Sequence, residues 1–400
     1  MHKIKLIEAG NELGLGGTEY AIQLYSKYLN KEYFDVTVVA LREGGPRREL
    51  IGKLGLRVVV LDGDLNKLAT MLQETDVFHW HGYGTLDQDL FEVIRDNKPK
   101  LVLQTNVFGA YKHTKLYNVI DYDLYISKMI LVRRMFYDQH LPDNFAYKRK
   151  VLSYPIDIPE IERLRPSDWE LQRFKRQHGL QGLFIVGRIG RADNAKFDLI
   201  TLDAFAAFAE NVKEAQFLLV GCTPEILFYV NQLGIQDKML ILENTADLEK
   251  LLYYYHSMDI FLAASEFGES FGMVIAESMV SGIPVVTIST PHKDNAQIEL
   301  VDNGTTGLVV ERSITKIADA LLFLYQHQDL RSAFSAASKR KVEEAYRASR
   351  IVKSLENLIF DHLRIPLLNS GGSLLTDYSQ EMVDEYISRL HNLWQPEIQL

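Results

Sequence analysis

Short apolar runs alternate along the chain with longer segments of helical period. The short runs predict strands at residues 4–7, 35–39, 58–61, 77–79, 101–104 and 124–127, and again at 184–186, 217–220, 239–242, 260–263, 285–288 and 308–310. Helical segments lie between several of them, at 19–29, 65–72, 197–209 and 271–280. This alternation is typical of parallel sheets that are covered by helices on both faces. We therefore predict an α/β protein.

The alternation breaks once, around Pro155 and Pro159, which restrict the backbone and disfavour helix. A chain of 400 residues is expected to form two or three domains. We predict an N-terminal α/β domain at 1–165, a second at 166–365 and a C-terminal tail at 366–400. In the tail, one helical stripe collects apolar residues and predicts an amphipathic helix packed back on the body: Met382, Val383, Tyr386, Ile387, Leu390 and Trp394.

Composition limits the class of protein and its surroundings. Apolar residues make up 47% of the chain and charged residues 24%, which excludes a fibrous or wholly disordered chain. The net charge of −9 argues against nucleic acid as the main partner. A single cysteine, Cys222, allows no internal disulfide and favours a reducing, cytoplasmic setting. No apolar run reaches the length of a signal peptide core or a membrane span.

The stretch from 260 to 286 contains the most informative pattern. A predicted strand runs into a glycine-containing loop, Ser270 is a candidate N-cap, and the helix that follows closes at Gly282. The carboxyl ends of parallel strands face the ligand crevice of such a sheet. The first amides of this helix, those of Phe271, Gly272 and Met273, would then point at a ligand with the positive end of the helix dipole behind them, which suits a phosphate.

Two carboxylates flank these amides. Glu269 stands in the loop and Glu277 lies in the helix, eight residues later. At that separation they reach different parts of one extended ligand. A carboxylate accepts hydrogen bonds from paired hydroxyls and therefore suits a ribose or a sugar.

The Glu-x7-Glu pattern formed by Glu269 and Glu277, followed by Gly282-Ile283-Pro284, resembles that of family 4 retaining glycosyltransferases, which belong to the glycosyl transferases group 1. Weaker matches extend over nearly the whole chain: the glycine loop Gly14-x-Gly16-Gly17, the element His79-Trp80-His81-Gly82, Val186-Gly187-Arg188, 217–221, and Glu299 with Gly304 and Gly307. The resemblance implies a GT-B fold, in which two Rossmann-like domains face each other across a cleft.

The resemblance also implies roles for residues. Glu269, Arg188 and Lys196 would be the catalytic residues, with Glu269 on the donor sugar and the two cations on the departing diphosphate. The donor would be bound by Glu277 at the ribose, by Phe271, Gly272 and Met273, and by Gly16 and Gly17 of the first domain. Fixed cations and amides stabilise charge that develops on the diphosphate. Two cations can replace a divalent metal, so we expect no cofactor and no metal.

The sequence departs from the family pattern at two places. Lys196 comes eight residues after Arg188 instead of about five, and Arg191 between them could take one of the two roles. The first domain lacks the usual histidine after a threonine, because Thr105 is followed by Asn106-Val107-Phe108. We place His81 and Asn106 on the acceptor side.

Other kinds of site are weaker interpretations. The glycine loop lacks the third glycine of a dinucleotide fingerprint, since Glu19 occupies that position. His79 and His81 alternate on a strand and could bind metal, but the sequence shows no third ligand. The acid pairs at 62–64 and 121–123 resemble a metal site of the other glycosyltransferase fold and are interpreted as loop acids.

The charge is unevenly distributed. Residues 98–150 hold ten basic against four acidic residues, with aromatic residues between them. Such a window could contact an anionic membrane or a polyprenyl-diphosphate-linked acceptor. The alternative is a set of solvated faces on separate elements.

Together these patterns predict a cytoplasmic glycosyltransferase, peripherally associated with the inner face of the membrane. It would move a sugar, with retention, from a nucleotide-diphosphate sugar to a hydroxyl of a saccharide or lipid-linked acceptor in polysaccharide, glycolipid or glycoconjugate synthesis. The alternatives are a non-catalytic partner or chaperone of an active transferase, and a nucleotide-sugar epimerase of the same fold.

Overall fold

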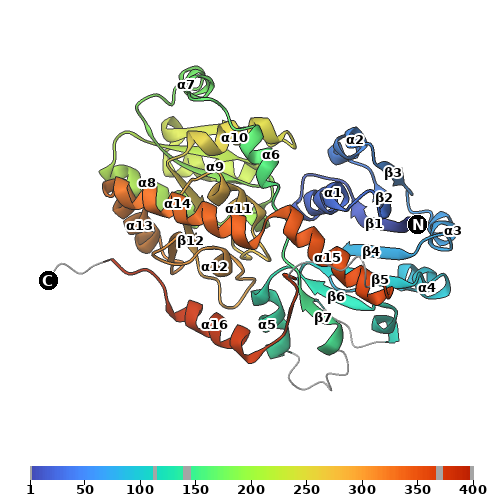
Figure 1. The fold of residues 1–400 in the computed structure, drawn as a ribbon. Coiled ribbons are helices and arrows are strands. Elements are labelled where there is room, and N and C mark those ends of the chain that lie inside the picture. The colour runs from blue at the N-terminus through green and yellow to red at the C-terminus, as the bar shows by residue number, and fades with distance from the viewer. Residues whose placement is uncertain (1, 111–114, 138–145, 366–372, 397–400) are drawn as a thin grey trace. The chain divides into compact units, whose positions relative to one another are not determined.

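The computed structural model describes residues 2–110, 115–137, 146–365 and 373–396. The chain forms two α/β units (Figure 1), Met1–Ile156 with Tyr346–Val383 and Asp157–Ala345 with Asp384–Leu400. Each unit is described by itself. The predicted α/β class is confirmed in both.

The first unit contains, within the described residues, an eight-stranded sheet. Its order is β14 (Thr376–Asp377), β7 (Arg149–Val151), β6 (Tyr122–Tyr125), β5 (Leu101–Asn106), β4 (Val77–Gly82), β1 (Ile4–Glu12), β2 (Phe34–Glu43) and β3 (Arg57–Val60). All neighbours are parallel except β14, which runs antiparallel to β7. The strand order therefore reverses direction between β1 and β4, which is where doubly wound sheets bind ligands.

Helices surround this sheet. They are α1 (Gly17–Tyr28), α2 (Pro46–Lys53), α3 (Leu65–Leu72), α4 (Gln88–Asp96), α5 (Lys128–Tyr137) and α15 (Ala348–His362), with 3-10 turns at Lys115–Val119 and Ala146–Lys148. The apolar runs of β1 and β4 are buried on both faces, as expected for central strands of a covered parallel sheet.

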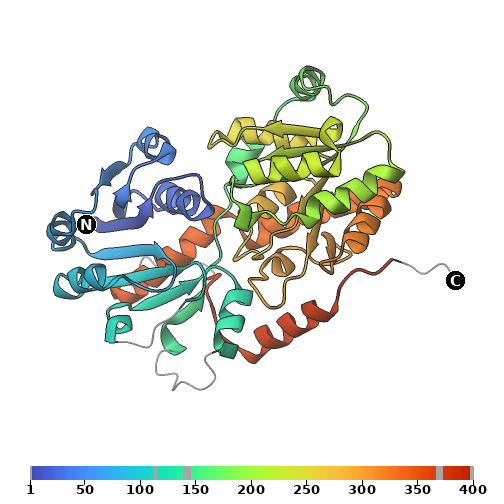
Figure 2. The ribbon, with the colours of Figure 1, turned by 180° about the vertical axis from the view of Figure 1, so that it is seen from behind.

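Helix α15 corrects the predicted domain boundary. It lies among the blue and teal elements of the first unit (Figures 1 and 2), although we predicted 166–365 as one second domain. Phe360 stacks on Phe34 with ring centroids 5.4 Å apart, and the amide of Asn30 donates to Glu356 at 2.7 Å. The first boundary also falls earlier than predicted, at Ile156, whose amide donates to Tyr346 at 2.8 Å.

The second unit contains a sheet of six parallel strands within the described residues. The order is β10 (Met239–Leu242), β9 (Ala215–Val220), β8 (Phe184–Ile189), β11 (Ile260–Ala263), β12 (Val285–Ile288) and β13 (Gly307–Val310). Its helices are α6 (Ile158–Arg163), α7 (Asp168–Gln177), α8 (Ile200–Asn211), α9 (Pro224–Leu233), α10 (Leu248–Ser257), α11 (Met273–Val280), α12 (Gln297–Leu300), α13 (Ile314–Gln326) and α14 (Gln328–Ala345), with 3-10 turns at Asn194–Lys196 and Gln236–Lys238. Here the order reverses between β8 and β11.

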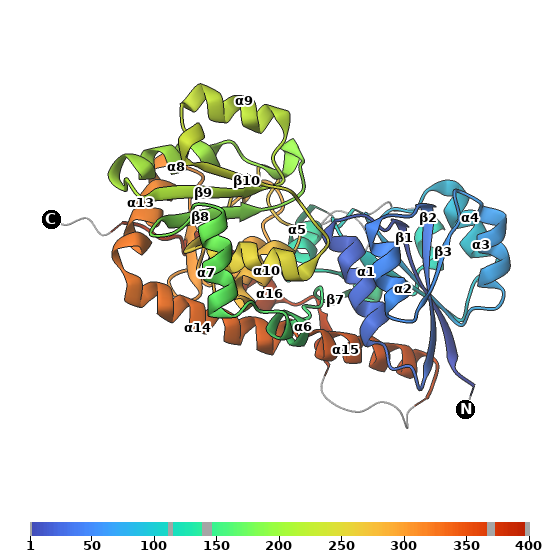
Figure 3. The same ribbon diagram turned by 90° about the horizontal axis from the view of Figure 1, so that it is seen from above.

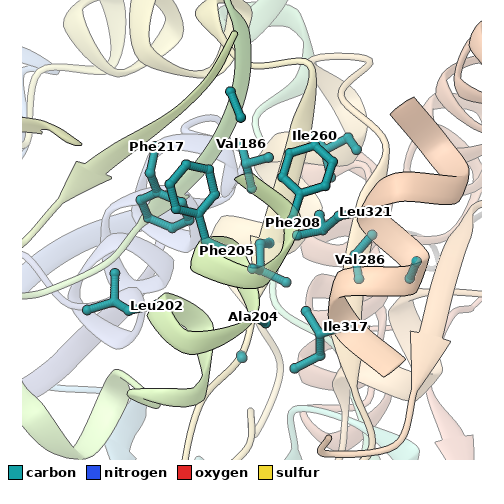
Figure 4. Close-up of a cluster of buried hydrophobic side chains, with 14 of the residues drawn as sticks. Val186, Leu202, Ala204, Phe205, Phe208, Phe217, Ile260, Val286, Ile317 and Leu321 are labelled. Atoms are coloured by element: carbon teal, nitrogen blue, oxygen red, sulfur yellow. The ribbon is translucent and has the colours of Figure 1, made fainter. Parts of the chain in front are cut away.

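One large apolar core holds α8 and α13 against this sheet. Phe205 and Phe208 of α8 pack with Phe217 of β9, Ile260 of β11 and Leu321 of α13 (Figure 4). Helix α8 lies on one face of the sheet and α10 on the other (Figure 3). Each of these buried side chains contributes about 1.5–3 kcal/mol, so the strand ends that carry the site rest on a rigid support.

The tail forms helix α16 (Gln380–His391). Met382, Val383 and Tyr386 are buried, whereas Ile387, which the predicted stripe places on the same face, is 43% exposed. Arg389 donates to Asp302 at 2.7 Å, and the amide of Trp394 donates to the carbonyl of Val309 at 2.8 Å. These bonds tie residues 389–394 to the second unit. No helix in the described part of the chain is both long enough and apolar enough to cross a bilayer.

Candidate functional site

The second unit brings the three predicted catalytic side chains together where its strand order reverses. Arg188 is on β8, Lys196 ends the 3-10 turn that follows it, and Glu269 stands in the loop after β11. The ammonium of Lys196 lies 3.6 Å from Oε2 of Glu269, and both side chains are partly accessible, at 29% and 16%. The site thus holds cations and a carboxylate at the position where a ligand is expected.

Arg188 lies beneath this pair and is 3% exposed. Its Nη2 donates to the carbonyl of Lys196, and its guanidinium lies 5.7 Å from the ring centre of Phe197. Burial lowers the pKa of Arg188, while Glu269 and Asp198 oppose that shift. Nη1 is buried with no hydrogen-bond partner in the described part of the structure. An unpaired buried donor costs about 1–3 kcal/mol or more, which makes this atom a candidate for binding a ligand oxygen once the surrounding chain moves.

The loop that carries Glu269 is clamped to the segment 290–297. The amide of Glu269 donates to Oε1 of Gln297 at 3.0 Å, and its carbonyl accepts from the amide of Ala296 at 2.8 Å. The hydroxyl of Ser270 donates to Asp294 at 2.6 Å. Gly268 has φ +70, and a Cβ there would collide with the carbonyl of Asp294. The backbone of Glu269 is therefore fixed before any ligand binds, which is what electrostatic catalysis requires.

The start of the following helix differs from the predicted one. Ser270 is not the N-cap, because its hydroxyl is used by Asp294, and α11 begins at Met273 instead of 271. Gly272 is the N-cap residue, with φ 99, a conformation that a side chain would strain. The first helical bonds run from the amides of Ile275 and Ala276 to Gly272. The amide of Met273 comes before the first of these bonds, and the first amides of a helix make no hydrogen bond within the helix.

Glu277 lies one turn into α11 and is 6% exposed. Its Oε2 is 2.8 Å from the hydroxyl of Tyr255 on α10, which is also 3.2 Å from the carbonyl of Val274. Tyr255 was not predicted, because it lies in an ordinary apolar helix without any motif.

Arg191 is half exposed and faces Asp193 at 3.6 Å, so Arg188 and not Arg191 is enclosed with Lys196 and Glu269.

The glycine loop belongs to the first unit. Gly16 is the N-cap of α1 and Gly17 its first residue. Gly16 has an ordinary φ of −71, and a Cβ there would meet only the movable end of the Glu19 side chain. The role of Gly16 and Gly17 in donor binding stays a prediction.

The histidine pair of β4 has a buried carboxylate partner that the sequence did not reveal. Glu8 of β1 lies 3.0 Å from Nδ1 of His79 and 2.7 Å from Nε2 of His81 through its Oε2, and all three side chains are fully buried. Nε2 of His79 is 2.8 Å from the hydroxyl of Thr105. These are also the three residues that could hold a metal ion. Glu8 precedes His79 by 71 positions, so no spacing motif could have indicated it.

A polar cavity of about 290 Å³ opens beside His81, where the strand order of the first sheet reverses. It is lined from β1, α1, β2 and β4, with Val107 at the end of β5. Asn106 does not line it. The amide nitrogen of Asn106 donates to Ala110 at 3.1 Å and to buried Asp123 at 3.2 Å, which indicates a structural role.

Part of the basic window is paired with acids or buried in the described structure. Lys98 pairs with Asp121 at 2.8 Å, Lys100 with Asp76 at 2.7 Å and Lys150 with Asp377 at 2.6 Å. Lys148 and Arg149 are buried. Lys112 lies outside the described residues. Five of the ten basic residues are therefore paired with an acid or buried, and membrane contact stays a prediction.

Part of the chain matches a glycosyltransferase family model and two curated relatives. Residues 181–327 match the family model described as glycosyl transferases group 1. N-acetyl-alpha-D-glucosaminyl L-malate synthase of Bacillus anthracis is 33% identical over 168 residues, 40% of this chain and 42% of that protein. Phosphatidyl-myo-inositol mannosyltransferase of Mycobacterium leprae is 29% identical over 174 residues, 42% of this chain and 46% of that protein. The matches thus span less than half the length of these relatives.

Solved structures match nearly the whole chain. A glycosyltransferase from Rickettsia africae has a TM-score of 0.74 at 14% identity, covering 91% of this chain and 100% of that one. Anabaena Alr3699/HepE in complex with UDP and glucose has a TM-score of 0.72 at 17% identity, covering 89% and 99%. The fold is therefore that of the GT-B glycosyltransferases. The resemblance to glycosyl transferases group 1 is confirmed by the family model, which matches within the second unit, and by the two partial relatives.

Proposed function

We propose that this chain is a glycosyltransferase that moves a sugar from a nucleotide-diphosphate sugar to an acceptor hydroxyl. The observation that carries the proposal is the grouping of Arg188, Lys196 and Glu269 at the reversal point of the second sheet, beside the N-terminus of α11. A diphosphate carries charge that two cations and helix amides stabilise, and more so as it departs. The relation to a structure bound to UDP and glucose supports a nucleotide-sugar donor.

In this mechanism Glu277 accepts hydrogen bonds from the ribose and Glu269 from hydroxyls of the donor sugar. Lys196, whose ammonium lies 3.6 Å from Glu269, neutralises the departing diphosphate. Arg188 supplies a second cation through Nη1. The acceptor hydroxyl attacks the same face that the diphosphate leaves, so the C1–O bond to phosphate breaks as the new glycosidic bond forms, and configuration is retained. The hydroxyl proton leaves with the diphosphate. No step requires a metal.

The grouping of Arg188 and Lys196 beside one carboxylate favours a catalytic role over that of a non-catalytic partner, because two cations at this position suit a diphosphate leaving group. The acceptor is proposed to be a hydroxyl of a small polyol, a saccharide or a glycolipid, bound by the first unit near His81.

The test is a panel of nucleotide sugars added to the purified chain, read by thermal shift and by transfer to a mixture of saccharide and polyol acceptors. A ligand of the native state raises Tm. We expect one nucleotide sugar to raise Tm and to yield an α- or β-linked product of the same anomeric configuration as the donor. Conversion of the donor without acceptor would identify an epimerase, and binding without any turnover would favour the non-catalytic partner.

A further inference from the structure

Asp198 is a buried carboxylate at the end of the segment that carries Lys196. It stands two residues after Lys196, just before α8, and its side chain is 3% exposed. Its Oδ1 accepts from the amide of Ile200 at 3.2 Å, and its own amide donates to the carbonyl of Ala264 at 3.4 Å. Ala264 directly follows β11. Asp198 therefore fixes the end of this segment against the strand that leads to Glu269.

The charge of Asp198 is met by Arg312, in the loop between β13 and α13. Nε of Arg312 donates to Oδ2 at 2.6 Å and Nη2 donates to Oδ1 at 2.8 Å, the two parallel bonds of a bidentate pair. The hydrogen bonds to Asp198 raise the pKa of Arg312, which therefore keeps its charge. Helix α13 is held in the core by Ile317 and Leu321 (Figure 4). Arg312 thus reaches Asp198 from a firmly packed element.

Arg188 is the second cation that Asp198 affects. Burial lowers the pKa of Arg188, and the negative charges of Glu269 and Asp198 oppose that shift. Each of these carboxylates already has another cation, because Lys196 lies 3.6 Å from Glu269 and Arg312 holds Asp198. Nη1 of Arg188 is buried and has no hydrogen-bond partner within the described residues. Among these five groups three cations face two carboxylates, and the surplus positive charge lies on Arg188.

Loss of Arg312 would change this balance. Asp198 would become a nearly buried carboxylate without a cation, and an unpaired buried charge is strongly unfavourable. Arg188 is the cation whose pKa Asp198 already influences, so the two would pair and occupy the donor that is free for a ligand. The site would then hold as many carboxylates as cations and would attract an anion less strongly.

We propose that Arg312 is a positioning residue of the donor site, and that it neutralises Asp198 so that Nη1 of Arg188 stays available for an anionic ligand. The inference rests on the proposed function in one respect, since the ligand is taken to be the diphosphate of the donor. The alternative is a mechanical clamp, in which the bidentate pair only holds Lys196 in place. The two accounts predict opposite effects of removing the charge of Asp198.

The test measures binding of inorganic pyrophosphate to the full chain, by isothermal titration calorimetry at low ionic strength, where charges are least screened. We expect Arg312→Met to weaken binding about tenfold, because Arg188 then pairs with Asp198 and loses its bond to the anion. Arg312→Lys keeps the charge without the bidentate geometry, and should bring binding back to within about threefold of wild type.

Asp198→Asn separates the two accounts. Asparagine keeps an oxygen for the amide of Ile200 and removes the charge. We therefore expect pyrophosphate to bind about two- to fivefold more tightly than to wild type, because a nearby negative charge is gone. A mechanical clamp predicts weaker binding instead, as in Arg312→Met. The double variant Asp198→Asn/Arg312→Met should bind within about twofold of wild type, since the two groups act as a unit.

The matched control is Arg163→Met. Arg163 is 63% exposed and makes the same kind of two-bonded pair, with Glu160, on α6. This helix contributes no residue to the donor site described above. Loss of the Arg163 charge should leave pyrophosphate binding unchanged, which separates the effect of Arg312 from a general effect of net charge.

Three results would overturn the proposal: wild-type affinity in Arg312→Met, weaker binding in Asp198→Asn, or a double variant as weak as Arg312→Met. If Arg312→Met does not fold, the tighter binding expected of Asp198→Asn still decides. Absence of pyrophosphate binding by the wild-type chain would overturn the proposed donor site as well. The expected order of affinities without transfer to any acceptor would leave this inference standing and remove the proposed function.

Discussion

The two units place their candidate sites at the same topological position and give them opposite hydrogen-bonding character. In both, the strand order reverses beside the first strand, between β1 and β4 in one and between β8 and β11 in the other. The cavity of the first unit is lined by Glu12, Glu19 and Glu43, whose carboxylates accept hydrogen bonds. The second offers Arg188, Lys196 and helix amides, which donate them. The fold therefore fixes where a ligand binds, and the side chains decide between hydroxyls and phosphates.

Removing the charge of Glu269 should have the largest effect on the second site. In Glu269→Gln the partner of Lys196 loses its charge and the donor sugar loses a strong acceptor, so we expect transfer to fall about 10²–10³-fold. Circular dichroism and Tm should stay close to wild type, because the backbone clamp through Gln297 is kept.

The matched control is Glu266→Gln, in the same loop. Glu266 is 51% exposed and faces Lys293 at 3.6 Å, so its loss should leave the rate unchanged. Equal losses in both variants would mean that the loop needs its net charge and that Glu269 has no specific role.

The buried cation of the second site should come next. Arg188→Met removes the charge while filling the space, and we expect transfer to fall about hundredfold because one stabiliser of the departing diphosphate is lost. Tm should fall moderately, because the carbonyl of Lys196 loses its donor, while the desolvation cost of the buried charge is removed. Arg191→Met, at the half-exposed arginine nearby, is the comparison. A larger loss of transfer in Arg191→Met than in Arg188→Met would mean that Arg191 binds the diphosphate. That result would contradict the enclosure of Arg188 with Lys196 and Glu269.

Sequence patterns located the sheets well and the contacts between distant segments poorly. Strands at 239–242, 260–263 and 285–288 were predicted to the residue, because strands in a covered sheet are continuous apolar runs. Strand β7 was missed, since Arg149-Lys150-Val151 is mostly polar. The period of α15 predicts a buried face but not which unit it packs on.

The same limit applies to the sites. Glu269, Lys196 and Arg188 could be found from a pattern, and the structure groups them. Ser270 was preferred as an N-cap on propensity, yet the positive φ of Gly272 decides the start of α11. The pairing of Glu8 with His81 joins two strands through tertiary structure, and no local rule reveals it.

Each unit holds a histidine with a lowered pKa, the buried His81 in the first and the half-buried His256 in the second, and this should appear as a loss of stability in acid. Burial and His79 lower the pKa of His81 to about 4, and burial with Arg165 and Lys339 lowers that of His256 to about 4. The unfolded value is about 6.5. Between these pH values the unfolded chain binds more protons, so the free energy of unfolding falls as pH drops from about 6.5 to about 4, by on the order of 2 kcal/mol for each group.

Denaturant unfolding at several pH values would measure this slope. His81→Asn and His256→Gln should each flatten it, and if the two units unfold separately, each variant should change only its own transition. An unchanged slope in both variants would show that these side chains are exposed to solvent in the native state.

Removal of metal should have the smallest effect of all, and the reason differs between the two units. In the second unit Arg188 and Lys196 supply the positive charge that a divalent ion would supply, so prolonged dialysis against a chelator should leave the rate of transfer unchanged. In the first unit Glu8, His79 and His81 form a set that could bind zinc, but the carboxylate of Glu8 already lies 3.0 Å from Nδ1 of His79 and 2.7 Å from Nε2 of His81. Elemental analysis of the dialysed protein would confirm that activity and metal content are independent. If activity is lost on dialysis and returns when metal is added, the Glu8→Gln variant would show which unit binds the metal. Activity restored by metal in that variant would place the metal at the donor site. Activity that metal does not restore would place it at the Glu8 cluster.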